Sequence, residues 1–169
     1  MTSLPAALGL EAARVISVCG AGGKTSLIFA LAHAFAEAGE RVLVTTTTKL
    51  ARKEAEGPLP WCHAADSNAV LAWAKTRFAE AGDAPPPLLA VSGPDASGEK
   101  CVGFTPEVID EIADASLFTR ILIEADGSRK CPLKTSAPHE PVIASSTEAT
   151  VFVVGLNGIG EPLDQAHVP

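Results

Sequence analysis

The fold is decided by residues 14–35, RVISVCGAGGKTSLIFALAHAF, in which a glycine-rich turn separates two apolar segments. Arg14–Cys19 is short, apolar and β-branched, a pattern typical of a strand buried on both faces of a parallel sheet. Lys24–Ala38 carries apolar residues at helical spacing and ends at Gly39, which can cap a helix. Arg41–Thr46 is strand-like again, so this region predicts a βαβ unit.

The same alternation continues along the rest of the chain. A short helical turn is expected over residues 4–10, a longer helix over Ser67–Ala81, strands over Leu88–Val91, Arg120–Glu124 and Thr150–Val154, and a helix with Thr105 as N-cap and Pro106 in its first turn. Residues 92–100 are rich in turn-forming residues and are expected to be rich in loop, and residues 127–148 are predicted to form an extended loop. Strands alternating with helices favour a doubly wound, mostly parallel sheet.

Composition and charge exclude several classes of protein. The chain has 47% hydrophobic and 20% charged residues and a net charge of −7, without a block of Lys and Arg, so we expect no nucleic-acid partner. No apolar run approaches a membrane span and no signal peptide is visible, which favours a cytoplasmic protein without membrane attachment. The four scattered cysteines form neither a zinc signature nor a disulfide framework.

The turn GAGGKTS, residues 20–26, follows a strand and opens a helix, which is the setting of a phosphate-binding loop. Glycines bring backbone N–H groups close to phosphate oxygens, and the helix N-terminus adds a partial positive charge. We expect Lys24 to reach the β- and γ-phosphates and the Thr25 hydroxyl to ligate Mg²⁺. The expected nucleotide-binding residues are Gly20, Ala21, Gly22, Gly23, Lys24, Thr25 and Ser26.

The match to the full motif G-x-x-x-x-G-K-[ST] is incomplete, because Val18 occupies the position of its first glycine. The shorter G-x-x-G-K-T has the spacing seen in Mur-type amide ligases and is related to loops of SIMIBI-type NTPases. A dinucleotide site is an alternative, but it needs a glycine where Thr25 stands; a glycine turn without a ligand is another. We expect an α/β, P-loop NTPase-like three-layer sandwich that binds Mg²⁺ with ATP or GTP.

Two carboxylates follow a buried strand pattern in the segment ILIEADG, residues 121–127. Ligands bind at the carboxyl edge of a parallel sheet, and an acid at that edge holds magnesium in phosphoryl-transfer sites. We expect Glu124 to bind Mg²⁺ with Thr25, and Asp126 to orient water or to complete a second metal site. Lys24, Glu124 and Asp126 are therefore the expected catalytic residues; the alternative is an ordinary Asp-Gly turn.

Further polar residues are candidates for a second substrate. The hydroxyls of Thr45–Thr48, followed by Lys49, would lie beside the glycine turn, although threonine is also common in strands for its β-propensity. Arg129, Lys130 and Lys134 follow the two acids and could hold an anion, or could be solvated loop residues. His139 stands between two prolines, where a lone histidine usually has no catalytic role. The expected substrate-facing residues are Thr46, Thr47, Thr48, Lys49, Arg129 and His139.

Five blocks of sequence resemble the YqeC family in family order. They are VCGAGGKTSLIFALA (residues 18–32), RVLVTTTTK (41–49), ILIEADGSRKCPLK (121–134), APHEPVI (137–143) and VVGLNGIGEPLD (153–164). Members of this family are described as accessory proteins of selenium-dependent molybdenum hydroxylases and as selenium-cofactor biosynthesis proteins. The combination of GAGGKTS, TTTTK, EADGS and PHEP is specific to it, whereas each motif alone is not.

The resemblance implies a nucleotide-binding accessory protein, a probable NTPase, that acts with a molybdenum hydroxylase client or a selenium donor. It maps the loop onto Gly20–Thr25 and the acidic motif onto Glu124 and Asp126. An ATP-dependent kinase or ligase acting on a small acceptor and a non-catalytic, nucleotide-switched chaperone are the alternatives. Family members generally continue past the last block, so we expect residues 1–169 to be a single domain that is truncated or takes cover from a partner.

Overall fold

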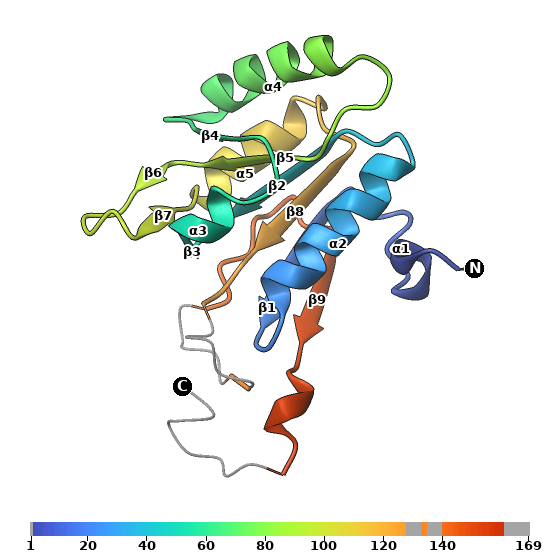
Figure 1. Ribbon diagram of the computed structural model, residues 1–169, viewed down its shortest axis with the longest axis vertical. Helices are drawn as coiled ribbons and strands as arrows, with labels where there is room; N and C mark the ends of the chain where they lie inside the picture. Colours follow the sequence, from blue (N-terminus) through green and yellow to red (C-terminus); the bar gives the residue numbers. More distant parts are fainter. Residues whose placement is uncertain (1, 128–132, 135–139, 161–169) are drawn as a thin grey trace.

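The apolar runs form the centre of a six-stranded sheet in a computed structural model that describes residues 2–127, 133–134 and 140–160 (Figure 1). From edge to edge, the strands are β4 (Trp61–His63), β5 (Leu88–Val91), β2 (Val42–Thr46), β8 (Arg120–Glu124), β1 (Val15–Gly20) and β9 (Ala149–Val153). Every pairing in this sheet is parallel. The chain therefore has an α/β architecture with a parallel sheet flanked by helices.

Helices cover both faces of the sheet and give the molecule three layers (Figure 1). One face carries α1 (Leu4–Ala7), α2 (Lys24–Glu37) and α3 (Arg52–Ala55), and the other carries α4 (Ser67–Ala81) and α5 (Pro106–Asp114). A 3₁₀ turn, η1 (Leu156–Gly158), follows β9. No helix in the described part of the chain combines the length and the apolar character needed to cross a bilayer.

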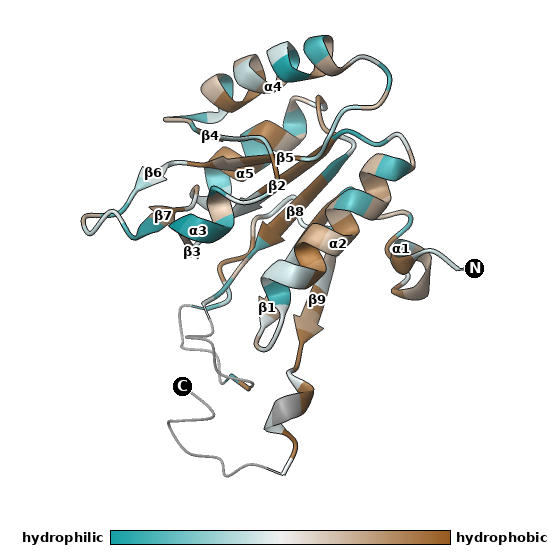
Figure 2. Cartoon of the chain, in the orientation of Figure 1, coloured by the Kyte–Doolittle hydropathy of each residue, from teal (hydrophilic) through white to brown (hydrophobic). Residues whose placement is uncertain are grey.

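Alternate residues of the central strands pack into two separate cores. In β8, Leu122 packs with α2 on one face, while Ile121 and Ile123 pack with α5 on the other. This alternation follows from the period of two residues in a strand. All residues of β1 are buried, because both faces of the sheet are covered, and Figure 2 shows β5 and β8 as strongly hydrophobic strands.

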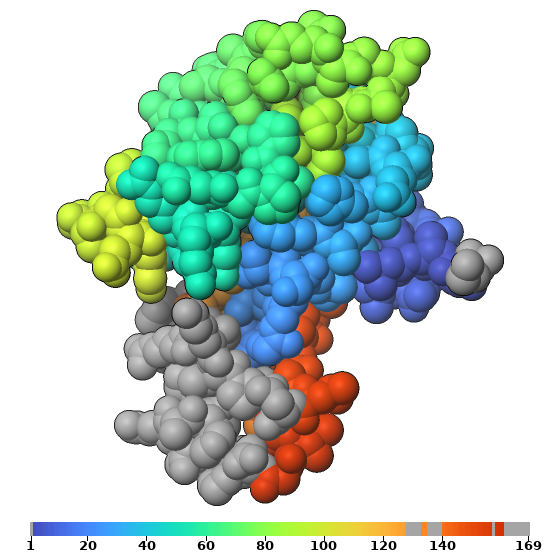
Figure 3. All heavy atoms as spheres, in the orientation of Figure 1, coloured from blue at the N-terminus to red at the C-terminus, as the bar shows by residue number. Residues whose placement is uncertain are grey.

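A small antiparallel sheet lies at the carboxyl ends of β2 and β5. Its strands are, in order, β3 (Lys49–Ala51), β7 (Lys100–Val102) and β6 (Gly93–Pro94). In the space-filling view the segment around β6 and β7, coloured yellow-green, protrudes from the body of the molecule (Figure 3). The segment after β2, which contains β3, and the segment after β5, which contains β6 and β7, thus form one small sheet, the added wall, beside the main sheet.

Gly103 fixes this wall to the end of β2. Its N–H donates to Thr48 O at 2.6 Å, and a Cβ at this position would lie 2.0 Å from Thr46 O. The N–H of the next residue, Phe104, donates to Thr46 O at 2.9 Å. A side chain at position 103 has no room, so the close approach of the two backbones depends on glycine.

The sequence predicted the long elements closely. Ser67–Ala81, Leu88–Val91 and Arg120–Glu124 have the expected bounds, and most other predicted elements shift by one or a few residues. Thr105 is the N-cap of α5, although its side chain makes no capping hydrogen bond. Residues 92–100, expected to be rich in loop, also contain the two-residue strand β6 and the first residue of β7. The described residues between 127 and 148 contain no helix or strand, as expected.

Candidate functional site

The glycine-rich turn between β1 and α2 requires glycine for its backbone shape. Gly20, Gly22 and Gly23 have φ angles of 95°, 79° and 121°, in the region that side chains disfavour. Gly20 also packs against the edge strand β9, where an added Cβ would lie 2.2 Å from Val153 O. The turn is therefore held by the sheet and directs the chain sharply into α2.

Residues 22–26 line a cavity of about 760 Å³, and their N–H groups donate to no acceptor among the described residues. The first N–H groups of any helix lack a partner within the helix, so a cavity at this end presents donors to a ligand. Gly20 and Ala21 differ from this set. The Gly20 N–H donates to Asp126 Oδ2 at 2.8 Å and the Ala21 N–H donates to Val153 O at 2.8 Å.

Lys24 lies at the base of the cavity and is 3% exposed. Its ammonium donates to Gly20 O at 2.7 Å and lies 3.2 Å from Asp126 Oδ1 and 3.9 Å from Glu124 Oε1. One lysine thus contacts both carboxylates at the carboxyl end of β8, that of Glu124, the last residue of the strand, and that of Asp126 just beyond it. The structure brings together Lys24, Glu124 and Asp126, which the sequence singled out from segments about a hundred residues apart.

Asp126 is fully buried and connects the glycine turn to the segment after β8. Its Oδ2 accepts the Gly20 N–H and lies 3.4 Å from the Lys134 ammonium, while Oδ1 has only the ion-pair contact with Lys24. Lys134 is 4% exposed and also pairs with Glu140 at 2.6 Å. Both oxygens of Asp126 therefore face protein groups rather than the cavity.

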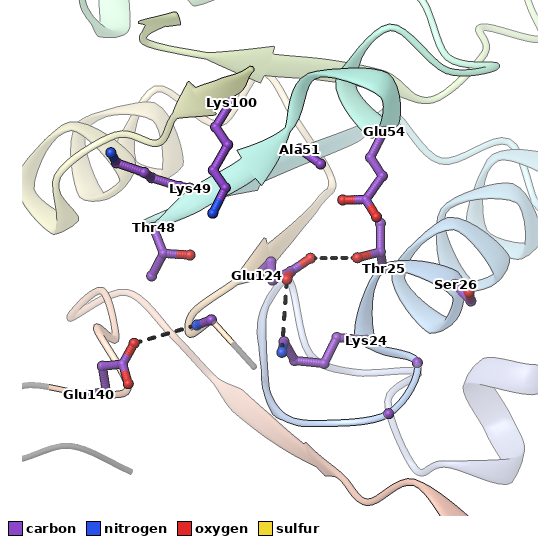
Figure 4. Close-up of a pocket in the computed structure, with 13 residues that line it drawn as sticks. Lys24, Thr25, Ser26, Thr48, Lys49, Ala51, Glu54, Lys100, Glu124 and Glu140 are labelled. Atoms are coloured by element: carbon purple, nitrogen blue, oxygen red, sulfur yellow. Dashed lines mark hydrogen bonds and ion pairs between the residues drawn. The ribbon is translucent and has the colours of Figure 1, made fainter. Parts of the chain in front are cut away.

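Glu124 meets Thr25 at the edge of the cavity (Figure 4). The Thr25 hydroxyl donates to Glu124 Oε2 at 2.9 Å, and the Glu124 side chain is 13% exposed. Burial raises the pKa of the Glu124 carboxyl, and the charge of Lys24 acts in the opposite direction. A hydroxyl and a carboxylate beside a cluster of N–H donors are the kind of oxygen ligands that Mg²⁺ takes when phosphates and waters supply the rest.

The opposite wall of the cavity comes from the small sheet and from α3. Thr48, Lys49, Ala51, Glu54 and Lys100 line it. Figure 4 shows the Lys100 ammonium pointing into the cavity and the Glu54 carboxylate pointing toward Thr25. Glu140 lines the cavity beside Gly127. Sequence reasoning missed Glu54, Lys100 and Glu140 as site residues: no local motif marks Glu54 or Lys100, and in the PHEP block it singled out His139 rather than Glu140.

The candidate substrate residues divide into three groups. Thr48 and Lys49 line the cavity. The hydroxyls of Thr46 and Thr47 donate to backbone oxygens, those of Glu124 and Val142, both at 2.8 Å, and so fix the end of β2. Arg129 and His139 lie outside the described residues.

Comparison with known proteins relates the chain to one family and one curated protein. The model of the family described as YqeC protein matches residues 16–169. A protein of Escherichia coli (strain K12), named "Uncharacterized protein YqeC", is 38% identical over 154 residues, which are 91% of this chain and 56% of that relative. The chain thus spans about half the length of the curated relative it matches. No solved structure matches the chain.

Proposed function

This chain belongs to the YqeC family, and we propose that it binds a magnesium–nucleoside triphosphate, ATP or GTP, and hydrolyses it. The observation that carries the proposal is the convergence of Lys24, Thr25 and Glu124 at a cavity that begins with unpartnered N–H groups. Phosphoryl-transfer sites combine a cation and a hydroxyl after a glycine turn, here Lys24 and Thr25, with a carboxylate at the end of a strand, here Glu124.

The glycine turn would hold the phosphates. The N–H groups of residues 22–26 and the N-terminus of the fourteen-residue helix α2 favour anionic oxygens at this place. The Lys24 ammonium would neutralise the β- and γ-phosphates from the base of the cavity. Because Asp126 faces Gly20 and Lys24, we assign it the task of positioning the loop and its lysine rather than of contacting water.

Thr25 and Glu124 would hold the magnesium ion, which supplies neutralisation of the charge on the phosphates. Mg²⁺ commonly takes one or two protein ligands and fills its octahedron with water and phosphate oxygens. The described residues contain no group of three or more His, Cys, Asp and Glu side chains placed to hold a metal, so the nucleotide itself would complete the coordination. Glu124 must be ionised for this role.

The biological context of the proposal comes from the family resemblance. We place the chain in the maturation of the selenium-containing cofactor of molybdenum hydroxylases, with a hydroxylase client or a selenium donor as partner. Nucleotide binding or hydrolysis would drive the maturation of that cofactor. The match covers 56% of the relative, so any activity of a protein of that full length is likewise part of this proposal.

Calorimetric titration of Mg–ATP and Mg–GTP into the wild type tests the proposal directly. Lys24→Ala should lose most of the affinity, because it removes the cation at the phosphates, and Thr25→Ala should lose its magnesium dependence. Lys75→Ala, in the exposed middle of α4, is the matched control and should bind as the wild type does. Equal affinity for all four proteins, or no binding to a folded wild type, would refute the nucleotide site.

Turnover then separates the remaining functions. Release of phosphate from the nucleotide alone supports an NTPase. Turnover that depends on an added acceptor identifies a kinase or ligase, and tight binding without any product supports a nucleotide-switched chaperone.

A further inference from the structure

Three lysines, Lys24, Lys49 and Lys100, line the cavity, and two of them, Lys24 and Lys100, lie on opposite sides of Glu124 (Figure 4). Lys24 belongs to the glycine turn and lies at the wall where the proposed phosphates bind. Lys100 belongs to β7, on the added wall, and its ammonium points into the cavity toward the region between Thr48 and Glu124 (Figure 4). The proposed function uses Lys24 and leaves Lys100 without a role.

Lys100 differs from the other lysine on the same wall. The Lys49 ammonium lies 3.2 Å from Asp95 Oδ2, and this contact together with the Ser97 hydroxyl lowers the pKa of Asp95 to about 2. The Lys100 ammonium makes no hydrogen bond or ion pair with any residue in the described ranges. Its charge is therefore uncompensated within that part of the chain, although three carboxylates, those of Glu54, Glu124 and Glu140, line the same cavity.

The backbone that carries Lys100 is held in place. Residues 100–102 pair with β3 on one side and β6 on the other, and Gly103 fixes the following turn against Thr46 and Thr48. The strand therefore presents the lysine at a defined position across the cavity from the glycine turn. A solvent-exposed cation on a fixed strand at a cavity wall, without an anionic partner among the described residues, can recognise an anionic ligand group.

We propose that Lys100, with the Thr48 hydroxyl, binds an oxyanion group of a second substrate, which accepts the γ-phosphoryl group of the nucleotide. This inference rests on the proposed nucleotide site and makes the protein a phosphotransferase or ligase. An oxygen of the acceptor attacks the γ-phosphorus, the bond to the β–γ bridging oxygen breaks, and the nucleoside diphosphate leaves with that electron pair. An ionised oxyanion acceptor carries no proton that must be removed.

The placement of the two lysines favours an acceptor over a further contact to the nucleotide. In-line transfer needs the attacking group on the side of the γ-phosphorus away from the leaving diphosphate. The glycine turn holds the diphosphate side, and β7 faces it across the cavity. Neutralising an anionic acceptor at that place also reduces its repulsion from the nucleotide phosphates.

The test uses inorganic phosphate as the probe and the amide NMR signals of the whole chain as the readout. Phosphate is titrated with and without a saturating non-hydrolysable ATP analogue and Mg²⁺. With the analogue bound, phosphate should shift the amides of residues 100–102 and 48 in a saturable way. Lys100→Gln should weaken this binding about tenfold, the range expected for a lost charge-assisted hydrogen bond. Lys100→Arg should retain most of it, and Lys75→Gln should bind phosphate as the wild type does.

The two proposals fail in different ways. Analogue binding at residues 22–26 without any saturable phosphate shift at residues 100–102 overturns the acceptor site and leaves the nucleotide site standing. Equal phosphate affinity of Lys100→Gln and the wild type overturns it too. If the analogue does not bind but phosphate still binds at residues 100–102 in a Lys100-dependent way, Lys100 binds oxyanions, but the nucleotide function falls and the role as acceptor site falls with it.

Discussion

Asp126→Asn is the substitution that most directly tests how the site is held together. The side chain is fully buried, and the ammonium groups of Lys24 and Lys134 lie 3.2 Å and 3.4 Å from its two oxygens. Both lysines are nearly inaccessible to water, with 3% and 4% of their side chains exposed. Asparagine keeps the shape and removes the charge, so the two cations lose the anion between them.

The expected cost is about 3 kcal/mol of unfolding free energy. Removing one partner of a buried ion pair costs about 3–5 kcal/mol, because the remaining charge stays buried. The lower end applies here, since Lys134 keeps Glu140 at 2.6 Å and Lys24 keeps Glu124 at 3.9 Å. With about 2–4 °C per kcal/mol for a domain of this size, the melting temperature should fall by about 6–12 °C.

Urea and thermal unfolding followed by circular dichroism measure this cost. Glu80→Gln is the control, because its pair with Arg77 lies on the surface, where such pairs contribute less than about 1 kcal/mol. A cost for Asp126→Asn no greater than that of Glu80→Gln would refute the argument that a buried charge network holds the loop.

Four further predictions concern the site, its walls and the thiol of Cys62 in β4. Glu124→Gln should abolish magnesium-dependent nucleotide binding in calorimetry without lowering the free energy of unfolding at pH 7. Burial raises the pKa of this carboxyl, so its ionised form costs folding free energy above that pKa. The difference in unfolding free energy between Glu124→Gln and the wild type should therefore vanish as the pH falls below the pKa of Glu124. For the same reason, magnesium-dependent binding by the wild type should weaken on acidification at a higher pH than an ordinary glutamate would give. Gly103→Ala should cost about 1–3 kcal/mol in urea unfolding, because its Cβ would lie 2.0 Å from Thr46 O, whereas Gly93→Ala has open space and should cost far less. The Cys62 thiol, whose pKa burial raises to about 11, should react with iodoacetamide at pH 8 about a hundredfold more slowly than in the unfolded chain, as measured by peptide mass spectrometry.

The central fold could be read from sequence because its signals are local. A buried parallel strand is a continuous apolar run, so β1, β2, β5 and β8 stood out, and the glycine turn marked the start of α2. Strands β3, β4 and β7 have three residues each, too few for a period of two to appear. Their pairing depends on contacts between distant segments, such as Gly103 against the end of β2.

The residues of the candidate site also fall into those that a local sequence signal marks and those that only contacts between distant segments bring to the cavity. Lys24 and Thr25 follow from the glycine motif, and Glu124 follows from its place at a strand end. Glu54 and Lys100 lie in segments with no motif, and only the pairing of β3 with β7 brings them to the cavity. Thr46 has a structural contact that sequence reasoning did not foresee: its hydroxyl, expected to face a substrate, donates to Glu124 O.

The contacts of Lys24 explain how a buried charge network can serve a binding site without being dismantled by the ligand. An ammonium has three donors, and one goes to Gly20 O while a second lies against Asp126. The third donor remains for a phosphate oxygen in the cavity that Lys24 lines. Asp126 at the same time accepts the Gly20 N–H, so one carboxylate fixes both the lysine and the start of the turn. Under the proposed function, phosphate binding would add a contact to an arrangement that already exists, and the entropy lost in ordering the lysine would belong to folding rather than to binding.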